Sequence, residues 1–135
     1  MKKFSFVFLA ILVLVGCQSK PVVGEAVASA AGSYQNVTPT ELESMLKDKD
    51  FVFINVHTPF AGDIPNTDLS IPYNEIEQNL SQLPSDKNAK IVLYCRSGRM
   101  SEIAAEELVS LGYTNVWNLK GGMVEWEQAD FELEK

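Results

Sequence analysis

The chain is poor in cysteine and in positive charge, and both shortages limit what it can do. It has two cysteines among 135 residues, too few for the four thiolate ligands of a zinc site. Its 11 basic side chains stand against 18 acidic ones, and the net charge of −7 argues against nucleic acid as a partner. Loops of the GxGxxG and GxxxxGK[ST] types are also absent. We therefore expect no metal and no nucleotide cofactor.

The first residues have the pattern of an export signal. Two lysines follow Met1, residues 4–15 are almost wholly apolar, and this stretch is too short to span a bilayer. It ends in Leu14-Val15-Gly16-Cys17, which resembles the lipobox of bacterial lipoproteins. The resemblance implies cleavage before Cys17, lipidation of that cysteine and anchoring to a bacterial membrane on the envelope or periplasmic side. An ordinary secretory peptide cut nearby, or an uncleaved anchor, is the alternative.

These features predict three segments: a signal peptide over residues 1–16, the lipidated Cys17 with a flexible tether over 17–33, and a folded domain over 34–135. The tether is expected because its segment is rich in small residues and shows little periodicity. With Cys17 lipidated, Cys95 is the only free thiol, and no disulfide can form within the domain.

The folded segment alternates apolar runs with amphipathic stretches. Strands are expected at 35–37, 51–56, 91–94 and 116–119, the longer runs being buried on both faces. Helices are expected after the capping-box pattern at Thr38, over 74–83, and from the residues after Cys95 to Gly112. This alternation predicts an α/β fold, a central parallel sheet of about five strands with helices on both faces.

The loop after the apolar run 91–94 is the most informative segment. Its residues are Cys95, Arg96, Ser97, Gly98, Arg99, Met100 and Ser101. A cysteine at the end of a strand and the start of a helix faces free backbone N–H groups, which favour an anion or a thiolate. The loop also contains the only two arginines of the chain. We interpret it as a reactive, anion-binding thiol; a buried core cysteine is the plainer alternative.

From about residue 34 to its end, the chain resembles the rhodanese-like domain family. Five motifs carry the resemblance, at residues 37–42, 53–57, 62–65 with 71–72, 94–101 and 119–126. It implies a single rhodanese-like domain and a sulfurtransferase without a cofactor. The Cys95 thiolate would take a sulfane sulfur from thiosulfate or a similar small anion and pass it, as a persulfide, to cyanide or a thiol. The loop from Arg96 to Ser101 would bind the substrate.

The chain departs from the family pattern at three positions. Family members commonly carry aspartate where Asn55 stands and arginine where His57 stands, and many carry arginine in place of Met100. The first two changes are expected to rearrange a local hydrogen-bond network without loss of the chemistry. The third is expected to affect the choice of donor, with Arg99 supplying a charge nearby. His57, the only histidine, is interpreted as structural more than as a general base.

The sequence is also compatible with two other functions. A cysteine-dependent phosphatase or arsenate reductase has a similar strand, loop and helix, but such enzymes typically place an arginine six residues after the cysteine, where this chain has Ser101. A module that carries sulfur or senses redox state without turnover is the other alternative.

Two further expectations concern neighbours of the loop. Gly121 and Gly122 should allow a close approach to it, and Asp63 and Asp68 either pair with its arginines or cap turns.

Overall fold

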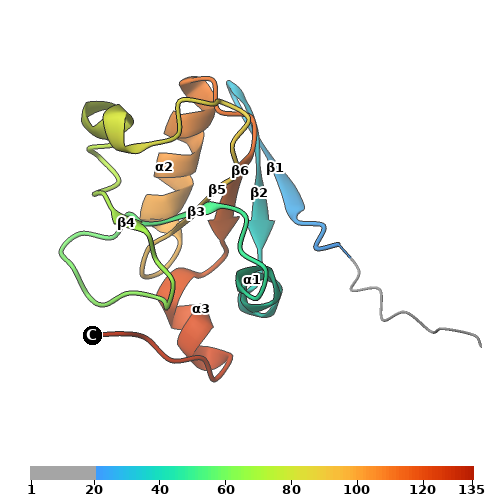
Figure 1. The fold of residues 1–135 in the computed structure, drawn as a ribbon, viewed down its shortest axis with the longest axis vertical. Coiled ribbons are helices and arrows are strands. Elements are labelled where there is room, and N and C mark those ends of the chain that lie inside the picture. Colours follow the sequence, from blue (N-terminus) through green and yellow to red (C-terminus); the bar gives the residue numbers. More distant parts are fainter. Residues whose placement is uncertain (1–20) are drawn as a thin grey trace, which may run out of the picture.

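A computed structural model describes residues 21–135, and its centre is a six-stranded sheet (Figure 1). The strand order is β1-β2-β6-β5-β3-β4; β1 runs antiparallel to β2, and the other neighbouring strands are parallel. In chain order the elements are β1 (Glu25–Ser29), β2 (Gly32–Val37), α1 (Pro39–Leu46), β3 (Val52–Asn55), β4 (Leu69–Ser70), the 3-10 helix η1 (Glu77–Gln82), β5 (Ile91–Tyr94), α2 (Arg99–Ser110), β6 (Val116–Leu119) and α3 (Gly122–Gln128).

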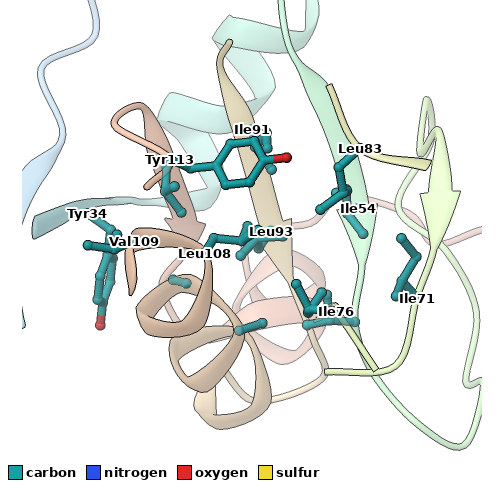
Figure 2. Packing of buried hydrophobic residues seen from close by; sticks show 14 of the residues in the cluster. Tyr34, Ile54, Ile71, Ile76, Leu83, Ile91, Leu93, Leu108, Val109 and Tyr113 are labelled. Carbon is teal, nitrogen blue, oxygen red and sulfur yellow. The ribbon is translucent and has the colours of Figure 1, made fainter. Parts of the chain in front are cut away.

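Each face of the sheet buries its own hydrophobic core. On one face α2 and the residues around η1 pack on β3 and β5, and Figure 2 shows Leu108 among the side chains that meet there. On the other face α1 and α3 pack on the alternate residues of the same strands, including Phe53 and Tyr94. The rings of Phe53 and Tyr94 lie 4.9 Å apart between centroids. The predicted α/β fold with helices on both faces is thus confirmed.

The helix and strand boundaries follow from local chemistry. Thr38 and Glu41 form the predicted capping box: the Thr38 hydroxyl accepts the Glu41 N–H at 3.3 Å, and the Glu41 carboxylate accepts the Thr38 N–H at 2.8 Å. All four residues of β5 are buried, as expected for a central parallel strand. The α2 helix ends where Gly112 takes a positive φ of 96°, a conformation that costs glycine little.

Four elements differ from the expectations. Residues 25–33, assigned to a flexible tether, form β1 and the start of β2. The backbone of β1 pairs with β2 at the edge of the sheet, and its small side chains bury little apolar surface. The segment 74–83 contains a 3-10 helix in place of an amphipathic α-helix, because Asn79 leaves helical geometry. β4 and α3 were not expected: β4 is two residues long, and α3 begins at a glycine.

The predicted signal peptide over 1–16 and the lipidation of Cys17 lie outside the described residues. Among the described residues, no helix has the length and apolar character needed to cross a membrane.

Candidate active site

Cys95 is the first residue after β5, at the carboxyl end of a central strand. Its side chain is buried, with 1% of its surface exposed. Ligands of open parallel sheets bind at this end of the strands. Four residues later α2 begins at Arg99, so the predicted placement of the thiol between a strand and a helix is observed.

Two donors surround the sulfur atom of Cys95. The backbone N–H of Gly98 donates to Sγ at 3.0 Å, and the hydroxyl of Ser101 lies 3.5 Å from Sγ. Gly98 has a φ of 103°, the left-handed region, and this bend turns its N–H back toward the sulfur. Such donors favour a charged sulfur over a neutral one.

The start of α3 fastens the loop from its outer side. The Met123 N–H donates to the Cys95 carbonyl and the Val124 N–H to the Arg96 carbonyl, both at 2.9 Å. The approach is so close that a side chain on Gly122 would overlap the Cys95 carbonyl oxygen. A side chain on Gly98 would likewise meet the Gly121 nitrogen at 3.2 Å. The close approach predicted for Gly121 and Gly122 is confirmed, and it gives α3 a role that sequence reasoning did not find.

The two arginines of the loop lie at the surface. Arg96 lines a pocket of about 150 Å³ together with Val124, Glu127 and Lys135. Arg99 is exposed at the first position of α2, and neither arginine forms an ion pair within residues 21–135. Both cations are therefore open to an anion approaching the loop, in a protein whose net charge is negative.

The other loop residues differ in their surroundings. Ser97 is exposed, whereas Ser101 is fully buried in the first turn of α2. Met100 is partly buried and packs against the core beneath α2. Met100, expected from the resemblance to replace a loop arginine, therefore contributes packing in this chain, and Arg99 is the neighbouring charge.

Asp63 and Asp68 do not pair with the loop arginines. Asp63 accepts hydrogen bonds from the Asn55 amide at 2.9 Å and from the Tyr94 hydroxyl at 3.1 Å. Asp68 accepts from the Phe53 N–H at 2.8 Å and pairs with Lys49. Both carboxylates thus fix the segment after β3 against the sheet.

Asn55 organises the segment that follows β3. Its buried amide donates to the Gly62 carbonyl at 3.0 Å as well as to Asp63, and its side-chain oxygen accepts the His57 N–H at 3.0 Å. Burial and the nearby Arg96 lower the pKa of His57, so its imidazole stays neutral to lower pH than usual. The network expected to be rearranged around Asn55 and His57 thus joins both residues to the segment after β3.

Tyr94, the residue before Cys95, connects this network to the end of β5. Its hydroxyl donates to Asp63, accepts the Ile64 N–H at 3.0 Å and lies 2.7 Å from the Thr67 hydroxyl. Burial is the main reason why the pKa of Tyr94 is raised, so the phenol stays protonated. Sequence reasoning missed this contact, since Tyr94 read as one residue of an apolar strand and Asp63 lies 31 positions before it.

The arrangement suits chemistry in which a sulfur atom gains and loses negative charge. A buried thiol has a backbone N–H and a hydroxyl within reach, and its loop carries two cations that form no ion pair with any described residue. Among the described residues the thiol has no disulfide partner, so it is chemically free.

Comparison with known proteins points to one family. Residues 38–129 match the model of the rhodanese-like domain. A sulfurtransferase from Allochromatium vinosum is 36% identical over 81 residues, which cover 58% of this chain and 73% of that protein. A tRNA uridine(34) hydroxylase from Erwinia tasmaniensis is 31% identical over 105 residues, or 73% of this chain. The match spans only 29% of the hydroxylase's length.

Solved structures agree on the fold. A rhodanese-like domain protein from Staphylococcus aureus is 30% identical, with a TM-score of 0.61 over 74% of this chain and 98% of that one. A rhodanese-related protein from Thermoplasma volcanium is 26% identical, with a TM-score of 0.63 over 74% of this chain and 97% of that one. The similarity thus extends over almost the whole of each of these two proteins.

Proposed function

Since the chain belongs to the rhodanese-like domain family, we propose that it is a sulfurtransferase that uses Cys95 to carry a sulfane sulfur. The observation that carries the proposal is the buried Cys95 sulfur, which has the Gly98 N–H at 3.0 Å and the Ser101 hydroxyl at 3.5 Å. A similar protein named sulfurtransferase supports the same reaction class.

In the first half-reaction the donor is thiosulfate or a similar small anion. The Cys95 thiolate attacks the outer sulfur of thiosulfate, the sulfur–sulfur bond of the donor breaks, and sulfite leaves with the electron pair. Arg96 and Arg99 attract the anion to the loop, and the backbone N–H groups from Arg96 to Met100 stabilise the charge that remains on the persulfide.

In the second half-reaction the persulfide gives up its outer sulfur. Cyanide or a thiolate attacks that sulfur, the bond to Sγ breaks, and the electron pair returns to Cys95. The enzyme is thus regenerated without a metal or a cofactor, and ping-pong kinetics follow.

Mass spectrometry tests this proposal directly. The intact protein is exposed to thiosulfate and then to cyanide, with Cys95→Ser as the control. We expect the wild type to gain the mass of one sulfur atom at Cys95 and to lose it again, and the variant to gain none. A wild-type protein that never gains sulfur would exclude the proposed reaction.

The phosphatase and arsenate reductase alternative receives less support from the site. Ser101, six residues after Cys95, is a buried helix residue without the cation that such enzymes place there. Hydrolysis of an aryl phosphate that disappears in Cys95→Ser would reverse this ranking. A module that carries sulfur or senses redox state without turnover is the second candidate, and multiple-turnover kinetics with cyanide separates it from an enzyme.

We further propose that the protein is an exported lipoprotein attached through Cys17 to a bacterial membrane, facing the envelope or periplasm. The apolar stretch 4–15 and the lipobox-like residues up to Cys17 support this location.

A further inference from the structure

The hydroxyl of Ser101 lies between two acceptors but has one hydrogen to donate. Its oxygen is 3.0 Å from the Gly98 carbonyl oxygen and 3.5 Å from Cys95 Sγ. The side chain is fully buried, so water offers no easy alternative partner. A hydroxyl hydrogen rotates to the better of its neighbouring acceptors.

The Gly98 carbonyl does not depend on Ser101. It also accepts the Glu102 N–H at 3.0 Å, the first backbone hydrogen bond of α2. When the Ser101 hydrogen turns away, this carbonyl keeps one partner and pays no full desolvation penalty. The charge of the Cys95 sulfur therefore decides which acceptor the Ser101 hydroxyl faces. A neutral thiol is a weak acceptor, whereas a thiolate is a strong one.

We propose that Ser101 is a catalytic residue whose hydroxyl turns from Gly98 to Cys95 Sγ when that sulfur becomes negatively charged. The inference rests on the proposed sulfur transfer and assigns Ser101 a role in one half of it. The hydrogen bond strengthens the state with charge on Sγ relative to the state in which the charge lies elsewhere.

The negative charge on Sγ changes in opposite directions in the two half-reactions: it decreases during loading and increases during discharge. During loading, Sγ is the nucleophile and gives an electron pair to the donor's outer sulfur, so a hydrogen bond to Sγ holds back the attack. During discharge, the acceptor attacks the outer sulfur, the bond between the two sulfurs breaks, and the electron pair goes to Sγ as leaving group. A donor aimed at Sγ favours that step. In the persulfide between the steps, most of the charge lies on the outer sulfur.

Single-turnover kinetics of Ser101→Ala separates these effects. At a pH where the thiol is fully ionised in every variant, we expect discharge by cyanide to slow roughly five- to tenfold, as befits one hydrogen bond to a charged atom. Loading by thiosulfate should be unchanged or faster. Ser110→Ala is the matched control, since Ser110 is an exposed serine at the opposite end of α2, and should change neither rate. Equal slowing of both half-reactions in Ser101→Ala would contradict the proposal.

A second pair of variants separates loss of the hydroxyl from disturbance of the fold. Threonine and valine have nearly the same shape but differ in the hydroxyl, so Ser101→Thr and Ser101→Val place the same bulk in the first turn of α2. We expect the threonine variant to discharge close to the wild-type rate and the valine variant to behave like Ser101→Ala. Equal rates in the two variants would overturn the assignment.

Alkylation tests the same contact without any sulfur donor. Cys95 reacts with iodoacetamide as the thiolate, so its rate of alkylation at neutral pH reports how well the loop stabilises the charged sulfur. We expect Ser101→Ala to react about three- to tenfold more slowly than the wild type and Ser101→Thr to react at close to the wild-type rate. Equal rates in the wild type and Ser101→Ala would exclude the hydrogen bond. If the wild type fails to load sulfur, the proposed reaction fails, while this measurement still decides the role of Ser101.

Discussion

Gly122 lies directly against the carbonyl oxygen of Cys95, and no side chain fits between them. Gly122 has a φ of 60°, and the next two residues of α3 donate their N–H groups to the carbonyls of Cys95 and Arg96. The carbonyl side of the Cys95 loop is therefore shaped by the residues that start the last helix. The geometry of the loop depends on a glycine that is remote in sequence.

Gly122→Ala should destabilise the protein more than an ordinary glycine substitution does. The left-handed backbone alone costs about 1–2 kcal/mol for alanine, and overlap with the loop backbone adds to this cost. Gly112→Ala is the matched control, since Gly112 also has a positive φ, 96°, but no atom within 4 Å of the added carbon. Urea unfolding measures both. Equal losses of stability would show that the contact with Cys95 is unimportant.

Replacing either loop arginine by alanine should weaken binding of the anionic donor. Both side chains are exposed and unpaired within the described residues, so stability should change little. We expect the KM for thiosulfate to rise about two- to fivefold in Arg96→Ala and in Arg99→Ala, as for loss of an exposed charge contact. The kcat should change less. Lys47→Ala, which removes an exposed cation at the C-terminal cap of α1, is the control. A KM that stays constant in both arginine variants would remove them from the donor site.

Asn55→Asp should destabilise the protein at neutral pH. The Asn55 amide donates to Gly62 and Asp63, and a carboxylate there would lose both bonds and face a second carboxylate. We expect a loss of about 2–4 kcal/mol. The new carboxyl would have a raised pKa in the folded state, so the lost stability should return as the pH falls.

Asn55→Asp combined with Asp63→Asn provides the control for this prediction. The double variant replaces the two facing carboxylates by one carboxylate and one amide, and it should recover part of the stability. Guanidinium unfolding of the two variants at neutral and mildly acidic pH makes the comparison. A single variant as stable as the wild type would show that the amide is not needed at position 55.

The imidazole of His57 should titrate below its usual value of about 6.5. Burial and then Arg96 lower the pKa of His57. As the pH falls through 6.5, the unfolded chain takes up a proton on His57 before the folded protein does, so this residue costs stability under acidic conditions and not above pH 7. NMR titration should show the depressed pKa and a partial rise in Arg96→Ala.

His57→Gln tests the consequence for stability. Across the pH range just below 6.5, the unfolding free energy of this variant should fall less steeply than that of the wild type. Parallel curves for the two proteins would mean that His57 has the same proton affinity in the folded and unfolded states.

The proposed anchor predicts the location of the protein in a bacterial host. The wild type should enter the membrane fraction and incorporate labelled fatty acid, and Cys17→Ser should do neither. Cys95→Ser should behave like the wild type, because its cysteine lies inside the folded domain. Labelling that persists in Cys17→Ser would contradict lipidation at this residue.

Sequence reasoning succeeded where local chemistry decides the structure. The buried runs of β3 and β5 and the capping box at Thr38 depend on neighbouring residues, and each was predicted near its observed place. Sequence reasoning failed where the structure depends on pairing between distant segments. β4 exists because Leu69 and Ser70 pair with β3, and β1 is an edge strand of small residues that depends on its partner β2.

The candidate site divides in the same way. The position of Cys95 between a strand and a helix could be predicted, because it depends on adjacent segments. The contact between Tyr94 and Asp63 could not, since it joins residues far apart in the chain. The two acceptors of the Ser101 hydroxyl also depend on the path of the loop backbone, which the hydrophobic pattern of the sequence does not predict.

The attachment of the Cys95 loop to α3 can form only late in the synthesis of the chain. The amides that hold the loop carbonyls belong to Met123 and Val124, and these are made 28 and 29 residues after the cysteine that they secure. Until those residues are made, the carbonyls of Cys95 and Arg96 lack these two hydrogen bonds. The carbonyl side of the Cys95 loop is thus the last part of the loop to be fixed as the protein is made.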